Sequence, residues 1–229
     1  MSKTYVNQLV LLALTIGSGR WACAQATQNV PKLGVDQLEL RNVKAEPVSY
    51  KGKDAVRLTD AGAPELDDAG RLAVIRGSSL TDGSIEVDLT GDTAPDAPAN
   101  LRGFVGIAFR VAADASHFEC FYLRPKNGRS SDPVQRSHSA QYISIPGLPW
   151  QKLRSESPGK YEAYVDLVPG EWTKAKIVVA GDKAQLYVNG SPQPTLVVND
   201  LKQPRAAGAI GLWVGPGTIA HFANLRITP

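Results

Sequence analysis

The segment 171–229 constrains the fold most, because it predicts a run of short strands separated by tight turns. Two β-rich stretches, 173–180 and 183–188, flank Gly181-Asp182, and Asn189-Gly190 follows the second stretch. Such pairs of small and polar residues are typical of two-residue hairpin turns, whose central positions require positive φ angles. Two further β-rich stretches follow before the end of the chain. The segment therefore predicts an antiparallel β-meander.

The rest of the chain beyond Val35 continues this pattern and shows almost no helical periodicity. Short β-rich runs recur between Gly, Pro, Asp and Asn signals, which predicts an all-β fold. Twelve strands suit two stacked antiparallel sheets better than one, so we expect a jelly-roll sandwich. The predicted strands span 38–43, 55–59, 73–76, 83–89, 103–111, 117–124, 139–145, 160–166, 173–180, 183–188, 208–214 and 220–228.

The N-terminal segment 1–24 has the features of a secretory signal peptide. Lys3 precedes the apolar run 9–16, and Ala22-Cys23-Ala24 is a small-x-small cleavage site. The apolar run is too short for a comfortable membrane span. Because Arg20 stands where a lipoprotein would need an aliphatic residue, we expect simple cleavage.

The expected cleavage point is after Ala24, with Ala26 the alternative. We therefore expect a lead-in over 25–34, one domain over 35–229, and a periplasmic or extracellular location. Three segments, 91–100, 127–136 and 145–158, are predicted as long irregular loops, and loops of this length on a rigid sandwich are where binding usually resides.

Charge and cysteine content narrow the classes of partner. Cleavage would remove Lys3 and Arg20, so the net charge of +3 would fall to 3 − 2 = +1. A nearly neutral protein is not expected to bind nucleic acid or an anionic membrane through electrostatic attraction. No later apolar run reaches the length of a membrane helix, so no membrane insertion is expected after cleavage. Cys120 would be the only remaining cysteine, and we expect a half-buried, inert thiol.

Six segments are informative when taken together: 82–89, 103–110, 171–179, 186–190, 208–213 and 222–227. They resemble the concanavalin A-like lectin/glucanase (laminin-G-like) superfamily. The resemblance covers 35–228 and is nearest to a secreted bacterial domain associated with 3-keto-disaccharide hydrolysis. It implies a two-sheet antiparallel jelly-roll sandwich and a carbohydrate ligand. The superfamily includes lectins, adhesion modules and glycosidases, so the resemblance leaves catalysis open.

The segment 117–141 concentrates polar side chains on two predicted strands and the loop between them. Residues of like parity share a face, so Tyr122 and Arg124 point the same way. That face should be the open, concave one, because burying an unpartnered Arg is costly. On the next strand, His138 should share a face with Tyr142.

A concave face with planar polar groups and an adjoining Trp suits a sugar, since such groups bond vicinal hydroxyls while a ring stacks on the pyranose. The alternative is a polar outer face with ordinary salt bridges. The candidate substrate-binding residues are Tyr122, Arg124, Asn127, Arg136, Gln141, Trp150 and Tyr164.

The predicted strand 160–166 alternates cleanly and would add Glu162, Tyr164 and Asp166 to that face. Glu162 is then the best carboxylate to lie near His138. A His-carboxylate pair can act as general base on a hydroxyl or on the proton beside a ketone, so both are candidate catalytic residues. A cross-strand ion pair on an exposed face is the alternative.

Other acidic groups support weaker hypotheses. Glu86 and Asp88 approach the carboxylate strand of laminarinase-type glycosidases, but Thr90 and Gly91 stand where a third carboxylate would be needed. An acidic cluster allows a structural Ca²⁺, although a solvated turn is favoured because no regular ligand motif is present. No other metal or cofactor is expected. The cluster consists of Asp60, Glu65, Asp67 and Asp68.

Three functions follow as hypotheses. The first is an enzyme that hydrolyses or eliminates 3-keto-glycosides, the second a lectin-like module without catalysis, and the third a protein-interaction module with a protein partner. The resemblance implies a Glu-x-Gln pattern on the central strand, whereas this chain has Ser139-Ala-Gln141. The absent Glu keeps the enzyme and lectin hypotheses both open.

Overall fold

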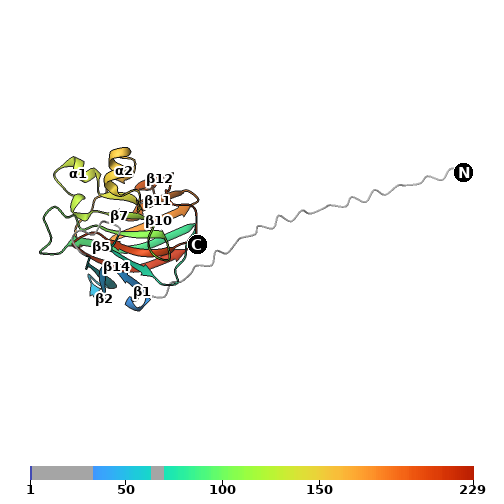
Figure 1. Ribbon diagram of the computed structural model, residues 1–229. Helices are drawn as coiled ribbons and strands as arrows, with labels where there is room; N and C mark the ends of the chain where they lie inside the picture. The colour runs from blue at the N-terminus through green and yellow to red at the C-terminus, as the bar shows by residue number, and fades with distance from the viewer. Residues whose placement is uncertain (2–32, 63–69) are drawn as a thin grey trace.

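A computed structural model describes residues 33–62 and 70–229, together with Met1. Fourteen β-strands among these residues form two seven-stranded antiparallel sheets, which stack as a sandwich (Figure 1). The predicted all-β jelly-roll fold is confirmed.

The first sheet contains the strands that carry three of the nine predicted site residues, Tyr122, Gln141 and Glu162. Its order is β1 (Leu38–Arg41), β4 (Leu72–Ile75), β13 (Ala209–Val214), β6 (Val105–Val111), β7 (Phe118–Leu123), β8 (Ala140–Ile145) and β9 (Glu162–Ala163).

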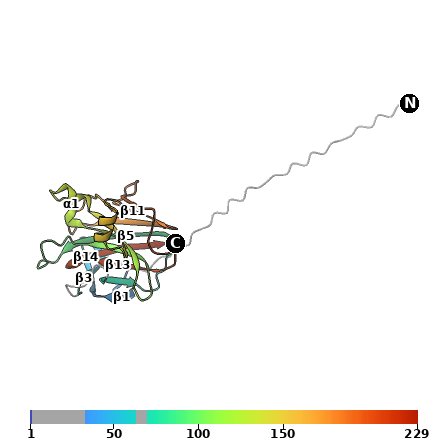
Figure 2. The same cartoon turned by 45° about the horizontal axis from the view of Figure 1, so that its top comes forward.

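The order of the second sheet is β12 (Leu196–Val198), β11 (Lys183–Val188), β10 (Thr173–Ala180), β5 (Gly83–Thr93), β14 (Thr218–Thr228), β3 (Lys53–Asp60) and β2 (Val43–Tyr50). In the second sheet the meander predicted over 171–229 is confirmed only for β10, β11 and β12, because β13 belongs to the first sheet and β14 pairs with β5 and β3. Figures 1 and 2 show β5 and β14 side by side at the centre of this sheet.

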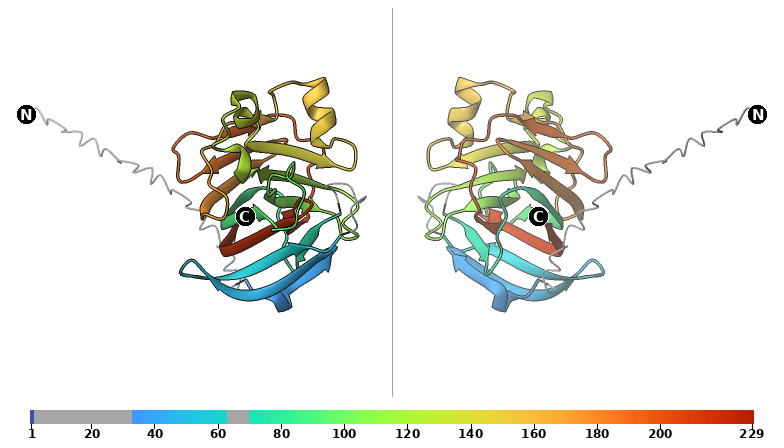
Figure 3. Two further views of the ribbon diagram at one scale, coloured as in Figure 1. Left: turned by 90° about the vertical axis from the view of Figure 1, so that its left-hand side faces the viewer. Right: turned by 90° about the vertical axis from the view of Figure 1, so that its right-hand side faces the viewer.

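Short helices complete the described part of the chain. They are the 3-10 helices η1 (Val35–Gln37) and η2 (Pro125–Asn127) and the α-helices α1 (Pro133–Ser137) and α2 (Trp150–Glu156). Both α-helices lie at one end of the molecule, opposite the hairpin of β2 and β3 (Figure 3). Neither has the length or apolar character that crossing a bilayer requires.

The two sheets differ in how their strands are buried. On β10, buried and more exposed residues alternate, as expected for a strand with one face toward the core and one toward water. On β6, β7 and β8 every residue is buried. The first sheet is therefore covered on both faces in this region, and its polar side chains there must find partners inside the protein.

The turn at Gly181-Asp182 forms as predicted and joins β10 directly to β11, whereas Asn189-Gly190 begins a longer connection from β11 to β12 and does not close a two-residue hairpin. Gly181 has a φ angle of 62°, and Asn189 and Gly190 have φ angles of 53° and 72°. A third tight turn joins β2 to β3 at Lys51 and Gly52, with φ angles of 43° and 78°. Only Gly adopts such angles without cost, and Asn tolerates them better than most residues.

Several sequence predictions differ from the structure. Strands β2 and β12 are additional to the predicted set, and β9 covers only two residues of the predicted strand 160–166. That strand ends early because it is an edge strand that pairs with β8 at two positions only. Helices α1 and α2 lie within the segments 127–136 and 145–158 that were expected to be irregular.

Cys120 is fully buried rather than half-buried. Burial raises the pKa of its thiol well above the usual range, which agrees with an inert cysteine. The predicted signal peptide lies within residues 1–24 and so almost entirely outside the described residues.

Within the second sheet, a buried histidine on β14 connects the central strand β5 to the edge strand β2. The His221 ring stacks on Tyr50 with the centroids 3.7 Å apart, and its Nδ1 lies 2.9 Å from Thr90 Oγ1. Tyr50 in turn donates a hydrogen bond to the carbonyl oxygen of Gly170. Burial, with the positive charges of Arg57 and Lys51, lowers the pKa of His221 to about 4.

This depressed pKa predicts acid sensitivity. Between pH 6.5 and about 4, His221 binds a proton in the unfolded chain but not in the folded protein. The contribution of His221 to the free energy of unfolding is therefore fully present above pH 6.5 and decreases as the pH falls. The free energy of unfolding, measured by urea denaturation across this pH range, should fall less for His221→Gln than for the wild type. His117→Gln, at an exposed position, is the control and should follow the wild type. Equal falls in all three proteins would contradict the prediction.

Candidate functional site

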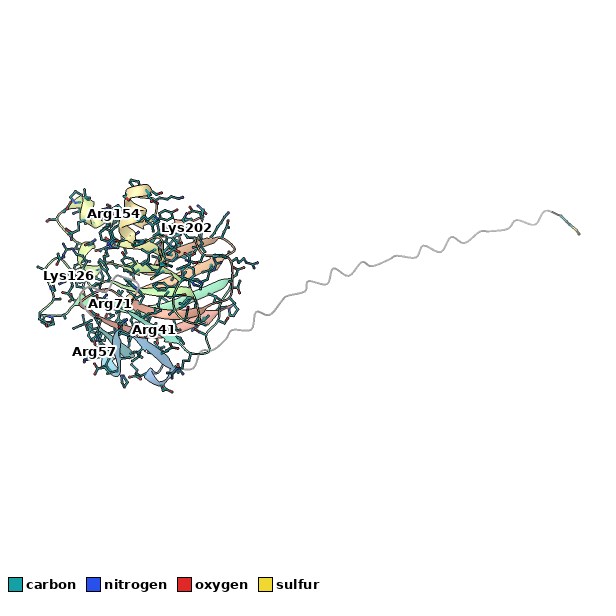
Figure 4. All side chains as sticks on the ribbon, viewed as in Figure 1. Arg41, Arg57, Arg71, Lys126, Arg154 and Lys202 are labelled. Atoms are coloured by element: carbon teal, nitrogen blue, oxygen red, sulfur yellow. The ribbon has the colours of Figure 1, made fainter. Side chains whose placement is uncertain are left out.

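A cavity of about 420 Å³ opens at the end of the first sheet that carries α1 and α2. Its size lies within the range of small-molecule sites. Figure 4 places Arg154, on α2, at the end of the molecule where both α-helices lie. The cavity is lined by Asn100, Arg102, Phe104, Arg124, Asn127, Asp132, Val134, Gln135, His138, Trp150 and Arg154.

The strands behind the cavity carry three polar side chains in one row. Tyr122 on β7 pairs with Gln141 on β8, which pairs with Glu162 on β9. On the other side of Tyr122 the row continues to Gly106 on β6. A Cβ atom at position 106 would lie 2.5 Å from the Cβ of Tyr122, so only glycine lets this tyrosine pack there.

Arg124 follows the end of β7 and joins the row to the cavity. Its Nη1 donates to the carbonyl oxygen of His138 at 2.9 Å and to Glu162 Oε1 at 3.2 Å. Its Nη2 donates to Tyr122 Oη at 2.7 Å and to Gln141 Oε1 at 3.1 Å. Arg124 is only 3% exposed, which differs from the expected open position. Four acceptors offset the cost of burying the charge.

Aromatic rings surround the same guanidinium. Its Cζ lies 5.0 Å from the ring centre of Tyr122, 5.1 Å from that of Phe104 and 5.3 Å from that of Trp150. The Trp150 ring also contacts Arg154, at 4.5 Å. Part of the Trp150 surface therefore packs against cations, and its remaining exposed surface faces the cavity.

Glu162 is the carboxylate that the two arginines share. Arg154 Nε lies 3.1 Å and 3.0 Å from its two oxygens, and Arg154 Nη2 also donates to Oε1. The Glu162 side chain is 3% exposed. Burial alone would raise the pKa of Glu162, but Arg154 and Arg124 outweigh it and hold this pKa below its usual value. Glu162 is therefore ionised and strongly held, which makes it a weak base.

His138 lies at the C-terminal end of α1 and not on the strand where it was expected to share a face with Tyr142. Its carbonyl oxygen accepts hydrogen bonds from Arg124 and from Asn127 Nδ2, the latter at 3.1 Å. Its Nε2 lies 3.6 Å from Glu162 Oε2, and its side chain is 22% exposed. The backbone is thus held firmly while the ring reaches the cavity.

The pKa of His138 is lowered. Partial burial is the largest cause, and the positive charges of Arg154 and Arg124 act in the same direction, against the opposing effect of Glu162. The imidazole is therefore neutral near pH 7, which is the form that accepts a proton.

Gln141 and Asn127 support other site residues more than they face the cavity. The Gln141 amide donates to the carbonyl oxygens of Tyr142 at 2.8 Å and Tyr161 at 3.1 Å, while its oxygen accepts from Arg124. The Asn127 oxygen accepts from Gln135 Nε2 at 3.0 Å. These amides hold Arg124 and His138 in place.

The structure brings together seven of the nine predicted site residues and leaves two apart. Arg136 donates to the carbonyl oxygens of Ser130 and Ser131 within its own loop, and it does not line the cavity. Tyr164 is 54% exposed and follows the end of β9. Strand β9 is too short to place Tyr164 on the face of Glu162. The residues brought together are Tyr122, Arg124, Asn127, His138, Gln141, Trp150 and Glu162.

Sequence reasoning missed Arg154, Arg102 and Phe104. The signal for Arg154 was its spacing of four residues from Trp150, which places both on one face of a helix. A seven-residue helix is too short to be recognised by periodicity.

The other acidic groups lie elsewhere. Glu86 and Asp88 belong to the second sheet and form ion pairs with Lys176 and Lys53. Of the acidic cluster, Asp60 pairs with Arg71, while Glu65, Asp67 and Asp68 are outside the described residues. Within 33–62 and 70–229, no group of three or more His, Cys, Asp or Glu residues is arranged to hold a metal ion.

Fold and cavity together define a two-sheet β-sandwich protein with a small-molecule-sized cavity at one end of the first sheet. A sequence model described as the 3-keto-alpha-glucoside-1,2-lyase-like domain matches residues 55–228, and the chain belongs to this family. The predicted resemblance is confirmed. No curated protein matches the chain.

Solved structures agree with this fold. The carbohydrate-binding module CBM66 from Bacillus subtilis has a TM-score of 0.57 at 14% identity, over 84% of this chain and 96% of that one. A protein of unknown function with a galectin-like fold, also from Bacillus subtilis, has a TM-score of 0.50 at 13% identity, over 85% and 90%. At such identities the likeness shows the fold alone.

The shared carboxylate predicts a large loss of stability in Glu162→Gln. Both guanidiniums would lose their counter-charge, and Arg124 would stay buried, so the free energy of unfolding should fall by about 3 kcal/mol. The matched control is Asp166→Asn, because Asp166 pairs with Arg129 where both side chains are more than half exposed. That change should cost less than about 1 kcal/mol. Denaturant titrations of both variants would measure the difference, and similar losses would contradict the burial argument.

Proposed function

We propose that the protein acts on 3-keto-glycosides in this cavity, with His138 as the base. The observation that carries the proposal is a neutral imidazole that reaches the cavity beside a fixed carboxylate and two guanidiniums. The family match supports the substrate class. We also propose secretion to the periplasm or the extracellular space through the segment 1–24.

The chemistry follows from the ketone. A carbonyl at C3 acidifies the proton on C2, and His138 would take that proton to give an enolate. Collapse of the enolate restores the ketone, forms the C1–C2 double bond and expels the C1 oxygen substituent. The imidazolium then returns its proton to the leaving oxygen, so His138 ends neutral. Addition of water to the unsaturated product would complete a net hydrolysis.

The arginines and Glu162 would serve this sequence in different ways. Arg124 and Arg154 line the cavity, and positive groups near a developing oxyanion lower the barrier to its formation. Glu162 lies 3.6 Å from His138 and would stabilise the imidazolium after proton transfer. Because Glu162 is ionised and held by the arginines, its role is to position and balance charge rather than to take the proton.

A lectin-like function without catalysis is the second candidate. It is favoured by the internal hydrogen bonds of Gln141 and Glu162, which are those of a structural network. In this case the exposed part of Trp150 would contact the sugar. Trp150→Ala would then weaken sugar affinity far more than His138→Ala.

The two candidates are separated by His138→Ala. If His138 is the base, kcat on a 3-keto-disaccharide should fall by a factor of about 100 or more, while affinity for the substrate changes little. His117→Ala, at an exposed position outside the cavity, should retain full activity. The wild-type rate should fall with decreasing pH through a pKa below 6.5. Binding of sugar by the wild type with no product would favour the lectin-like module.

A further inference from the structure

We propose that the cavity selects a glycoside that carries a carboxylate, such as a uronic acid residue, and that Arg102 binds this group. The inference rests on the proposed function, because it names the substrate class of the same cavity. It depends on the charges of the lining residues and on the partners of each arginine.

The cavity has an excess of positive charge. Its lining contains Arg102, Arg124 and Arg154 against one acidic residue, Asp132, which gives a formal charge of 3 − 1 = +2. Including the buried Glu162 behind the lining leaves +1. A cleft lined by one sign of charge raises the local concentration of ligands of the opposite sign. The proposed reaction of a neutral 3-keto-glycoside assigns a role to Arg124 and Arg154 but none to Arg102.

Of the three arginines that line the cavity, Arg102 is the one whose charge is not balanced by a carboxylate of the described residues. Arg124 and Arg154 both form ion pairs with Glu162, Arg124 at 3.2 Å and Arg154 at hydrogen-bond distance. Arg102 Nη1 donates only to main-chain carbonyl oxygens, those of Ala99 at 2.8 Å and Leu101 at 3.1 Å. In the described part of the chain no carboxylate lies within ion-pair distance of Arg102.

The neighbouring charged groups do not neutralise Arg102. Asp132 Oδ1 accepts a hydrogen bond from the Val134 amide at the start of α1, at 2.8 Å. Lys126, whose amide nitrogen bonds the Arg102 carbonyl oxygen, has its own partner in Asp92 at 3.6 Å. Arg102 is half-buried as a residue, and its guanidinium retains donors for a ligand besides the Nη1 that bonds Ala99 and Leu101. A guanidinium with available donors is suited to bind a carboxylate through two parallel hydrogen bonds.

The remaining lining suits the sugar ring. Phe104, two residues after Arg102, and Trp150 are both partly exposed in the cavity and offer apolar surface. Binding sites for small polar ligands combine such surface with a few polar groups that fix orientation. The ring would pack against these side chains, with its carboxylate directed to Arg102.

The test compares a glucuronide with the glucoside of the same aglycone, each with and without a 3-keto group. Calorimetric titration at low salt should show the glucuronide binding at least about tenfold more tightly, and added salt should reduce this preference because it screens charge. Arg102→Ala should remove the preference while affinity for the neutral glucoside stays within about twofold. Arg102→Lys, which keeps a charge, should retain part of it.

Arg76→Ala is the matched control, because Arg76 is exposed and its guanidinium donates to the carbonyl oxygen of Asp36, outside the cavity. It should bind both ligands as the wild type does. Equal affinities for glucuronide and glucoside in the wild type would overturn the inference, and so would a preference that survives in Arg102→Ala.

Product formation separates this inference from the proposed function. If the wild type converts both 3-keto-glycosides but binds them equally, the proposed function stands and the charge selection fails. If it prefers the glucuronide through Arg102 but converts neither ligand, the charge selection stands and the proposed catalysis fails.

Discussion

The buried guanidinium of Arg124 is the group on which the rest of the site depends. A cation removed from water must have its donors paired, and here the acceptors come from four places: Tyr122 on β7, Gln141 on β8, Glu162 on β9 and the carbonyl oxygen of His138 after α1. One side chain thus joins three strands to the helical segment. Displacing any of these acceptors would leave part of a buried charge unsatisfied.

The positive charge of Arg124 also affects the pKa values of the two titratable groups beside it, Glu162 and His138. Arg124 and Arg154 lower the pKa of Glu162 and so keep its carboxylate ionised. Burial lowers the pKa of His138, and the positive charges of Arg154 and Arg124 lower it further, so the imidazole stays neutral. An ionised acid beside a neutral base is the arrangement in which the base can take a proton and the acid can stabilise the result. The network that holds the fold at this end therefore also prepares a proton acceptor.

The second sheet acts mainly as the scaffold for this arrangement. Its strands β10 and β5 alternate between core and solvent, and its outer face carries ion pairs such as Lys176 with Glu86. The first sheet instead buries both faces of β6, β7 and β8, and polar groups appear there only where a partner meets them.

The sequence by itself determined the sandwich, the turns at Gly181 and Asn189, and the shared face of Tyr122 and Arg124, because these follow from local turn chemistry and two-residue alternation. It also indicated most of the side chains that meet at the site. Only the tertiary structure decided that Arg154 and Glu162 pair, that His138 ends a helix and that Arg102 is left without a carboxylate partner among the described residues. These relations join residues whose contacts leave no periodic signal, since helices of five and seven residues and an edge strand of two are too short to show one.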